Sequence, residues 1–100
     1  MDEIFARLAE ARIRILPLAE FTQHFVFERD GLVALVERQG DGFGQIGSAG
    51  LLEQEKFATL VQRAGRGWFV ARGFEREATE AEAAALRRFS QDLRRALGGD

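Results

Sequence analysis

The sequence predicts an α+β domain in which an antiparallel sheet of four to five strands is flanked by an N-terminal and a C-terminal helix. Three observations support this prediction: two hairpin patterns, an amphipathic segment near the C-terminus, and the order helix, strands, helix along the chain. The chain has 100 residues, enough for one hydrophobic core, so residues 1–100 are expected to form a single domain.

The N-terminal segment is expected to form a short helix from Asp2 to about Ile13. Apolar residues recur there at helical spacing, at Ile4, Phe5, Leu8 and Ala11. Pro17 prevents further helix because it lacks an amide hydrogen and restricts the residue before it. Arg14–Glu20 is therefore expected to be extended or irregular.

The first hairpin is predicted to pair Thr22–Arg29 with Leu32–Arg38 through the turn Asp30-Gly31. Aspartate followed by glycine favours a type I′ turn, which needs positive φ at both central residues. With a two-residue loop, Arg29 pairs with Leu32, and the residues before and after alternate between two faces. One face then carries Phe25, Phe27, Arg29, Leu32, Ala34 and Val36. The other carries His24, Val26, Glu28, Val33, Leu35 and Glu37.

The middle of the chain is rich in glycine, from Gln39 to Gly50, with a short strand expected around Phe43–Ile46. Leu51–Lys56 is predicted to be a helical turn or a connection. A second hairpin is predicted to join Phe57–Arg63 to Trp68–Glu75 around Gly65-Arg66, with a loop of two or four residues. Its predicted faces carry Phe57, Thr59, Val61, Trp68, Val70 and Phe74 on one side, and Ala58, Leu60, Phe69 and Ala71 on the other.

The C-terminal segment Thr79–Leu97 has the pattern of an amphipathic helix. Thr79 and Glu82 have the spacing of a capping box, and Gly98-Gly99 ends the segment. Its apolar stripe consists of Leu86, Phe89, Leu93 and Leu97. Four arginines occupy its later part, at Arg87, Arg88, Arg94 and Arg95. They complement the negative end of the helix dipole, and binding of a phosphate or an acidic partner is the alternative interpretation.

Composition excludes several classes of chemistry. The chain has no cysteine, so disulfides, thiolate metal sites and cysteine nucleophiles are impossible, and a cytoplasmic location is expected. The net charge is −2 at pH 7, which argues against a general affinity for nucleic acid. No apolar run reaches the roughly 18 residues that a membrane span needs. Lys56 is the only lysine, and this bias towards arginine is typical of a GC-rich bacterial genome.

Two motifs have a chemical interpretation that the sequence does not favour. Gly42–Gly47 matches G-x-G-x-x-G, but a dinucleotide site needs this loop to open a helix within a βαβ unit, and no such helix is expected. His24, the only histidine, is predicted to lie opposite Glu37. A histidine beside a carboxylate can act as a general base, but a cross-strand structural pair is favoured because no nucleophile is placed near it. No catalytic residue, metal ligand or cofactor is therefore predicted, and the protein is not expected to be an enzyme.

The leading hypothesis is a non-enzymatic protein-interaction or adaptor module, expected to be a homodimer. Both faces of the predicted hairpins carry large apolar residues, so the uncovered face would bind a second copy or another protein. The first alternative is a small-ligand-binding domain with a pocket under the Gly40–Gly50 loop, lined by Phe43, Trp68 and Phe74. The second is a single-stranded nucleic-acid binder using the Arg63–Arg76 hairpin. The candidate interface or binding residues are Val26, Val33, Leu35, Phe43, Trp68, Val70 and Phe74.

Overall fold

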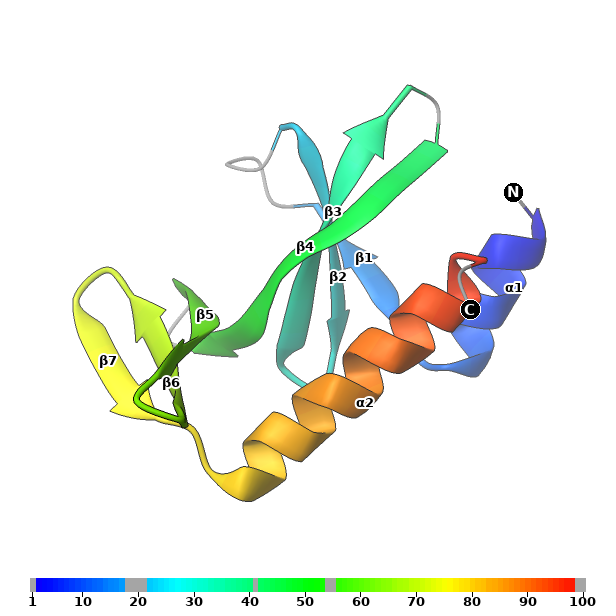
Figure 1. Ribbon diagram of the computed structural model, residues 1–100. Coiled ribbons are helices and arrows are strands. Elements are labelled where there is room, and N and C mark those ends of the chain that lie inside the picture. Colours follow the sequence, from blue (N-terminus) through cyan, green and yellow to red (C-terminus); the bar gives the residue numbers. More distant parts are fainter. Residues whose placement is uncertain (1, 18–21, 41, 54–55, 99–100) are drawn as a thin grey trace.

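The computed structural model describes residues 2–17, 22–40, 42–53 and 56–98. Seven strands in the described residues form one antiparallel sheet, and each strand pairs with its neighbour in the chain (Figure 1). The elements, in chain order, are α1 (Asp2–Glu10), β1 (Arg14–Leu16), β2 (His24–Arg29), β3 (Leu32–Gln39), β4 (Gly42–Glu53), β5 (Lys56–Arg63), β6 (Arg66–Ala71), β7 (Phe74–Glu77) and α2 (Glu80–Ala96).

The predicted α+β class and the antiparallel sheet between two terminal helices are confirmed. The predicted count of four to five strands is wrong, because two segments that looked irregular or continuous form additional strands. Arg14–Leu16, expected to be irregular, pairs with β2 as the edge strand β1. Trp68–Glu75, expected to be one strand, is divided between β6 and β7 by a tight turn, where Gly73 has φ of 97°.

The glycine-rich segment is the long strand β4 and not a loop. It has 12 residues and pairs with β3 from Gly42 to Leu51, and its last four residues, from Gly50 to Glu53, pair with β5, so backbone hydrogen bonds to neighbouring strands compensate for the low strand propensity of glycine. Leu51, predicted in a helical turn or connection, lies within this strand. Residues 54–55 of that predicted segment lie outside the described residues.

The register of the first hairpin is as predicted. Arg29 is paired with Leu32, and Asp30 and Gly31 have φ of 53° and 86°, as a type I′ turn requires. The Glu28 side chain stabilises this turn, because its Oε2 accepts a 3.0 Å hydrogen bond from the amide of Gly31. Burial raises the pKa of Glu28, but hydrogen bonds from Arg14 and Gly31 outweigh it, so the pKa lies below its ordinary value.

The second hairpin turns at Ala64-Gly65, one residue earlier than predicted, with φ of 52° and 78°. Val61 and Trp68, which were predicted to share a face, are paired with each other. Phe74 lies on the opposite face from the one predicted, because the turn at residues 72–73 starts a new strand in which Phe74 pairs with Ala71. Phe74 consequently packs against the core.

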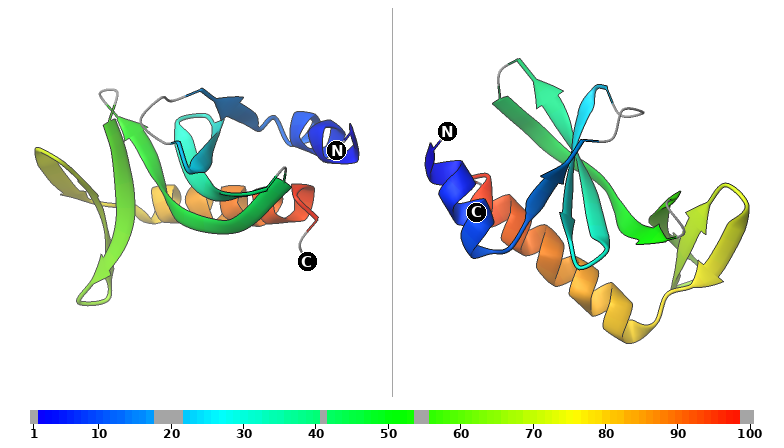
Figure 2. Two further views of the ribbon diagram at one scale, coloured as in Figure 1. Left: turned by 90° about the horizontal axis from the view of Figure 1, so that it is seen from above. Right: turned by 180° about the vertical axis from the view of Figure 1, so that it is seen from behind.

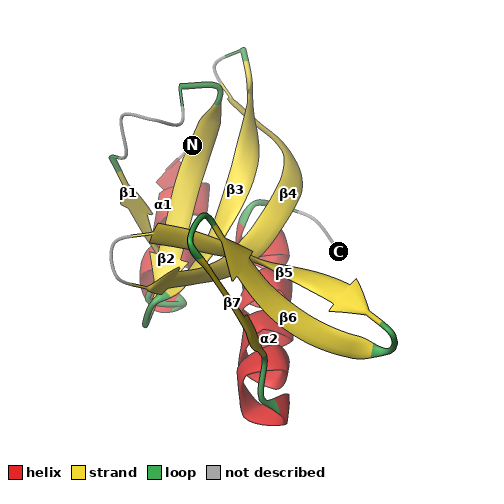
Figure 3. Cartoon of the chain, turned by 90° about the vertical axis from the view of Figure 1, so that its left-hand side faces the viewer, coloured by secondary structure: helices red, strands yellow, loops and turns green. Residues whose placement is uncertain are grey.

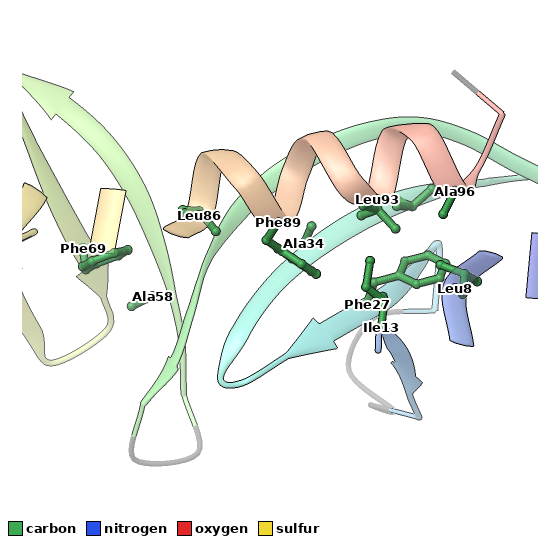
Figure 4. Packing of buried hydrophobic residues seen from close by; sticks show 11 residues of the cluster. Leu8, Ile13, Phe27, Ala34, Ala58, Phe69, Leu86, Phe89, Leu93 and Ala96 are labelled. Atoms are coloured by element: carbon green, nitrogen blue, oxygen red, sulfur yellow. The ribbon is translucent and has the colours of Figure 1, made fainter. Parts of the chain in front are cut away.

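The core lies between α2 and one face of the sheet. Leu86, Phe89 and Leu93 of α2 are buried against the strands, as the apolar stripe predicts (Figure 4). Leu97, which follows α2, packs against the same cluster. The capping box is confirmed: Thr79 Oγ1 accepts a hydrogen bond from the amide of Glu82, and Glu82 Oε1 accepts one from the amide of Thr79. These bonds satisfy amide groups that the first helical turn would otherwise leave unpaired.

The two helices meet at the end of the molecule where the described chain starts and ends (Figure 2). The Arg7 guanidinium of α1 donates a 2.9 Å hydrogen bond to the carbonyl of Ala96 in α2. Helix α1 ends at Glu10, before the predicted Ile13, because the chain turns at Arg12, which has φ of 60°, and Ile13 then enters the core.

The sheet bends strongly along β4, so that β5, β6 and β7 run across the direction of β2 and β3 (Figure 3). Gly50 lies where β4 is paired with both neighbours, opposite Val33 of β3 and Thr59 of β5. A Cβ atom on Gly50 would lie 1.8 Å from the carbonyl oxygen of Ala58. Only glycine permits this approach, and it brings the β5–β7 part of the sheet beside the start of α2.

Candidate interaction surface

The strand register places a second set of apolar residues on the face of the sheet that does not pack on α2. Among the described residues, neither the core cluster nor the apolar side chains packed against it include any member of this set. Val26 and Val33 of this set are 2% and 0% exposed, so the single chain already covers them. Leu35 is half-buried beside them. Of these three candidate interface residues from the first hairpin, only Leu35 remains accessible to a partner.

The rest of this face forms an apolar strip on β4, β5 and β6. The strip consists of Leu52, Phe57, Val61, Trp68 and Val70, all half-buried. The residues lie on three adjacent strands and point to the same side because their positions alternate with residues of the core face. Trp68 and Val70, both predicted as candidate interface residues, are thus brought together with Val61.

Two ion pairs lie beside the apolar strip. Arg63 of β5 is paired with Glu75 of β7 at 2.5 Å. Since β6 lies between these strands, the Arg63 side chain reaches Glu75 across β6, on the face that carries Trp68. Arg66 and Glu77 form the second pair at 3.4 Å. Exposed pairs of this kind contribute about 0–1 kcal/mol each, so a partner chain can replace them at little cost.

Phe43 and Phe74 do not join Trp68 in a binding pocket. The ring of Phe43 packs edge-on against Phe25 and Phe27, with centroid distances of 4.8 and 5.6 Å, on the core side of the sheet. Phe74 also lies on the core side, whereas Trp68 lies on the other. The predicted pocket under Gly40–Gly50 therefore lacks its three aromatic walls, because the segment is a paired strand rather than a roof.

The arginines of the Arg63–Arg76 hairpin are largely neutralised by carboxylates. Arg63 and Arg66 are paired as described, and Arg76 binds both Glu53 and Glu82, at 3.2 and 2.8 Å. The hydrogen bonds from Arg76 lower the pKa of Glu82 to about 2. Arg76 also lies over the ring of Phe69, 5.1 Å from its centroid. Arg76 thus fastens β7 to β4 and α2, which is a structural role and weakens the case for phosphate binding here.

In the described residues, the Gly42–Gly47 motif and His24 lack the neighbouring groups that a phosphate-binding or catalytic role would need. Gly42–Gly47 lies inside β4, and the segment that follows it is strand, so the phosphate-binding geometry of G-x-G-x-x-G is missing. His24 lies opposite Glu37 in the register, as predicted. Within the part of the chain that the structure describes, His, Asp and Glu side chains form no group of three or more that could hold a metal ion.

Several polar residues that are remote from one another in sequence lie together in the folded chain. Ser48 of β4, Thr59 of β5 and Ser90 of α2 line one hollow together with Arg87. Arg87 and Arg94 are seven residues apart, so the sequence alone indicates that both lie on one side of the helix. Their strand neighbours could not be found in this way, since they are remote in sequence.

No protein-family model, curated protein or solved structure matches this chain. None of the helices in the described ranges is long and apolar enough to cross a membrane. The function is therefore inferred from the residues and surfaces of the chain itself.

Proposed function

We propose that this protein is a non-enzymatic protein-interaction module that forms a homodimer through the apolar strip. The observation that carries the proposal is the set of half-buried apolar side chains on β4, β5 and β6 that lie outside the core cluster of the described residues, namely Leu52, Val61, Trp68 and Val70. Contiguous apolar surface that the core does not use is uncommon on a monomer and marks contact surfaces. Trp68 supplies the large aromatic side chain that commonly anchors such contacts.

A second copy of the chain suits this surface because the charges beside the strip balance. Arg63 and Arg66 carry positive charge, and Glu75 and Glu77 carry an equal negative charge. A two-fold axis through the strip would bring the arginines of one copy towards the glutamates of the other, which is the self-complementary arrangement of a closed dimer. A partner that carries mainly one sign of charge would not be electrostatically complementary to this surface.

We propose that the dimer resides in the cytoplasm of a bacterium. The absence of cysteine fits a reducing compartment, and the use of arginine at nearly every basic position fits a GC-rich bacterial genome. The formal charge of −2 favours a protein partner over a nucleic acid.

Sedimentation equilibrium at micromolar concentration tests the proposal. The parent chain is expected to show about twice the 11.2 kDa chain mass. Val70→Glu introduces a charge at the centre of the strip and is expected to give the monomer mass, because burying an unpaired carboxylate in an interface is costly. Phe5→Glu is the matched control, since Phe5 is an exposed apolar residue (48%) on α1, outside the strip. It is expected to remain a dimer.

A monomeric parent chain would refute the homodimer. Equal dissociation of Val70→Glu and Phe5→Glu would also refute it, because the strip would then have no special role. Circular dichroism spectra of both variants establish that each one is folded before its mass is interpreted.

A further inference from the structure

A groove runs between α2 and the strands β4 and β5, and it shares no residue with the apolar strip. Two hollows follow one another along it. One, of about 480 Å³, is lined by Gln45 of β4 and Arg94 of α2, among others. The next, of about 380 Å³, is lined by Ser48 of β4 and by Arg87 and Ser90 of α2. The hollows adjoin because their β4 residues are consecutive and their α2 residues lie on one side of the helix.

The groove is positively charged on a protein of negative net charge. No acidic residue lines either hollow in the described parts of the chain, and the carboxylates Glu77 and Glu80 line a separate hollow that Arg87 also borders. Arg87 and Arg94 are exposed, and neither has an ion-pair partner among the residues that the structure describes. Arg63, Arg66 and Arg76 are all paired with carboxylates. The groove therefore offers two guanidinium groups that are free to bind anions.

The spacing of these arginines indicates the shape of the ligand. Arg87 and Arg94 are seven residues apart, which is about two helical turns or 10.5 Å along α2. An extended peptide covers the same distance in about three residues, at roughly 3.3 Å each. Carboxylates four positions apart lie on one side of such a peptide and would reach both arginines, whose side chains are long and flexible.

The remaining lining of the groove suits a peptide backbone. Gly44 and Gly47 of β4 have no side chains to fill the space beside them. Ser48, Ser90 and Gln45 add hydroxyl and amide groups that can donate to or accept from a peptide. Among the described residues, no aromatic side chain lines either hollow, so the bases of a nucleic acid would have no ring on which to stack.

We propose that this groove binds an extended acidic segment of a partner protein, whose carboxylates pair with Arg87 and Arg94. The inference does not depend on dimerisation through the apolar strip, because the two surfaces have no residue in common. It gives an interaction module a second, chemically different surface.

Fluorescence anisotropy with a fluorescein-labelled octapeptide of alternating glutamate and alanine tests the inference. The parent chain is expected to bind it and to ignore the octapeptide in which glutamine replaces glutamate. Arg87→Gln/Arg94→Gln is expected to weaken binding about tenfold, because it removes both of the exposed guanidinium groups that pair with the carboxylates of the peptide. Arg88→Gln/Arg95→Gln is the matched control: same helix, same spacing and same loss of charge, but another side of α2. It is expected to change binding less than about threefold, as a screened surface charge does.

Four results would overturn the inference. These are failure of the parent chain to bind the glutamate peptide, equal binding of the glutamine peptide, equal weakening by the two double variants, and tighter binding of a thymidine octanucleotide that needs Arg87 and Arg94. The last result would replace the peptide by a nucleic acid. The charge-reversed variant Arg87→Glu/Arg94→Glu guards against a folding artefact, since it is expected to bind the corresponding lysine–alanine octapeptide instead.

Discussion

Replacing Gly50 by alanine is expected to lower the free energy of unfolding by about 3 kcal/mol or more. The new Cβ would lie 1.8 Å from the carbonyl oxygen of Ala58 and 2.8 Å from its carbon. These are backbone atoms of β5, so β4 and β5 would have to separate by more than 1 Å to reach even 3.0 Å. Overpacking costs about 1–3 kcal/mol, and each backbone hydrogen bond broken by the separation adds about 1 kcal/mol.

Gly47 provides the matched control within the same strand. A Cβ there would lie 3.6 Å from the carbonyl oxygen of Leu35, which is ordinary van der Waals contact. Gly47→Ala is therefore expected to be neutral or to stabilise by up to about 1 kcal/mol, through reduced entropy of the unfolded chain. The two substitutions add the same methyl group to β4 and are expected to have opposite signs.

Urea unfolding measures both changes. Trp68 is the only tryptophan and reports the unfolding of β6 by its fluorescence, while circular dichroism reports the helices. A loss of 3 kcal/mol is a large part of the 5–15 kcal/mol expected for a domain. If Gly50→Ala and Gly47→Ala have unfolding free energies within about 1 kcal/mol of each other, the close approach of β4 and β5 is not as described.

Phe89→Ala removes a fully buried ring and is expected to cost about 3–5 kcal/mol in urea unfolding; a loss below 1 kcal/mol would mean that Phe89 is not core. Thr79→Ala removes the cap of α2 and is expected to cost about 0.5–2 kcal/mol, and unchanged stability would place the cap elsewhere. The pKa of Glu82 is lowered to about 2 by Arg76, so its stabilisation is complete above its ordinary pKa of 4.5 and is lost as pH falls towards 2. Because the pair is partly solvent-exposed, that stabilisation is about 1–2 kcal/mol, and Glu82→Gln is expected to lose less stability than the parent between pH 5 and pH 2. Equal acid sensitivity of the parent and Glu82→Gln would contradict this assignment.

Local sequence patterns are enough to locate the elements whose signals lie within a few residues of one another. The capping box and apolar stripe located α2, because a helix is stabilised by groups three and four positions apart. Asp30-Gly31 determined the first turn, and the turn then set the register of β2 and β3. Alternation of side chains along a strand placed Trp68 and Val70 on one face, and the structure has them there.

Features that depend on residues remote in sequence can be seen only in the folded chain. Strand β1 exists because it pairs with β2, and β4 is a strand despite its glycines because it pairs with β3 and, at its end, with β5. The turn at residues 72–73 moved Phe74 to the core face, and a one-residue change of register reverses every side chain beyond it. Whether a face is covered is a property of the folded sheet and not of any local pattern. Val33 is therefore buried within one chain, and Arg87 and Ser48 line the same groove. Neither fact can be predicted from one segment of the sequence, because each depends on how distant segments pack together.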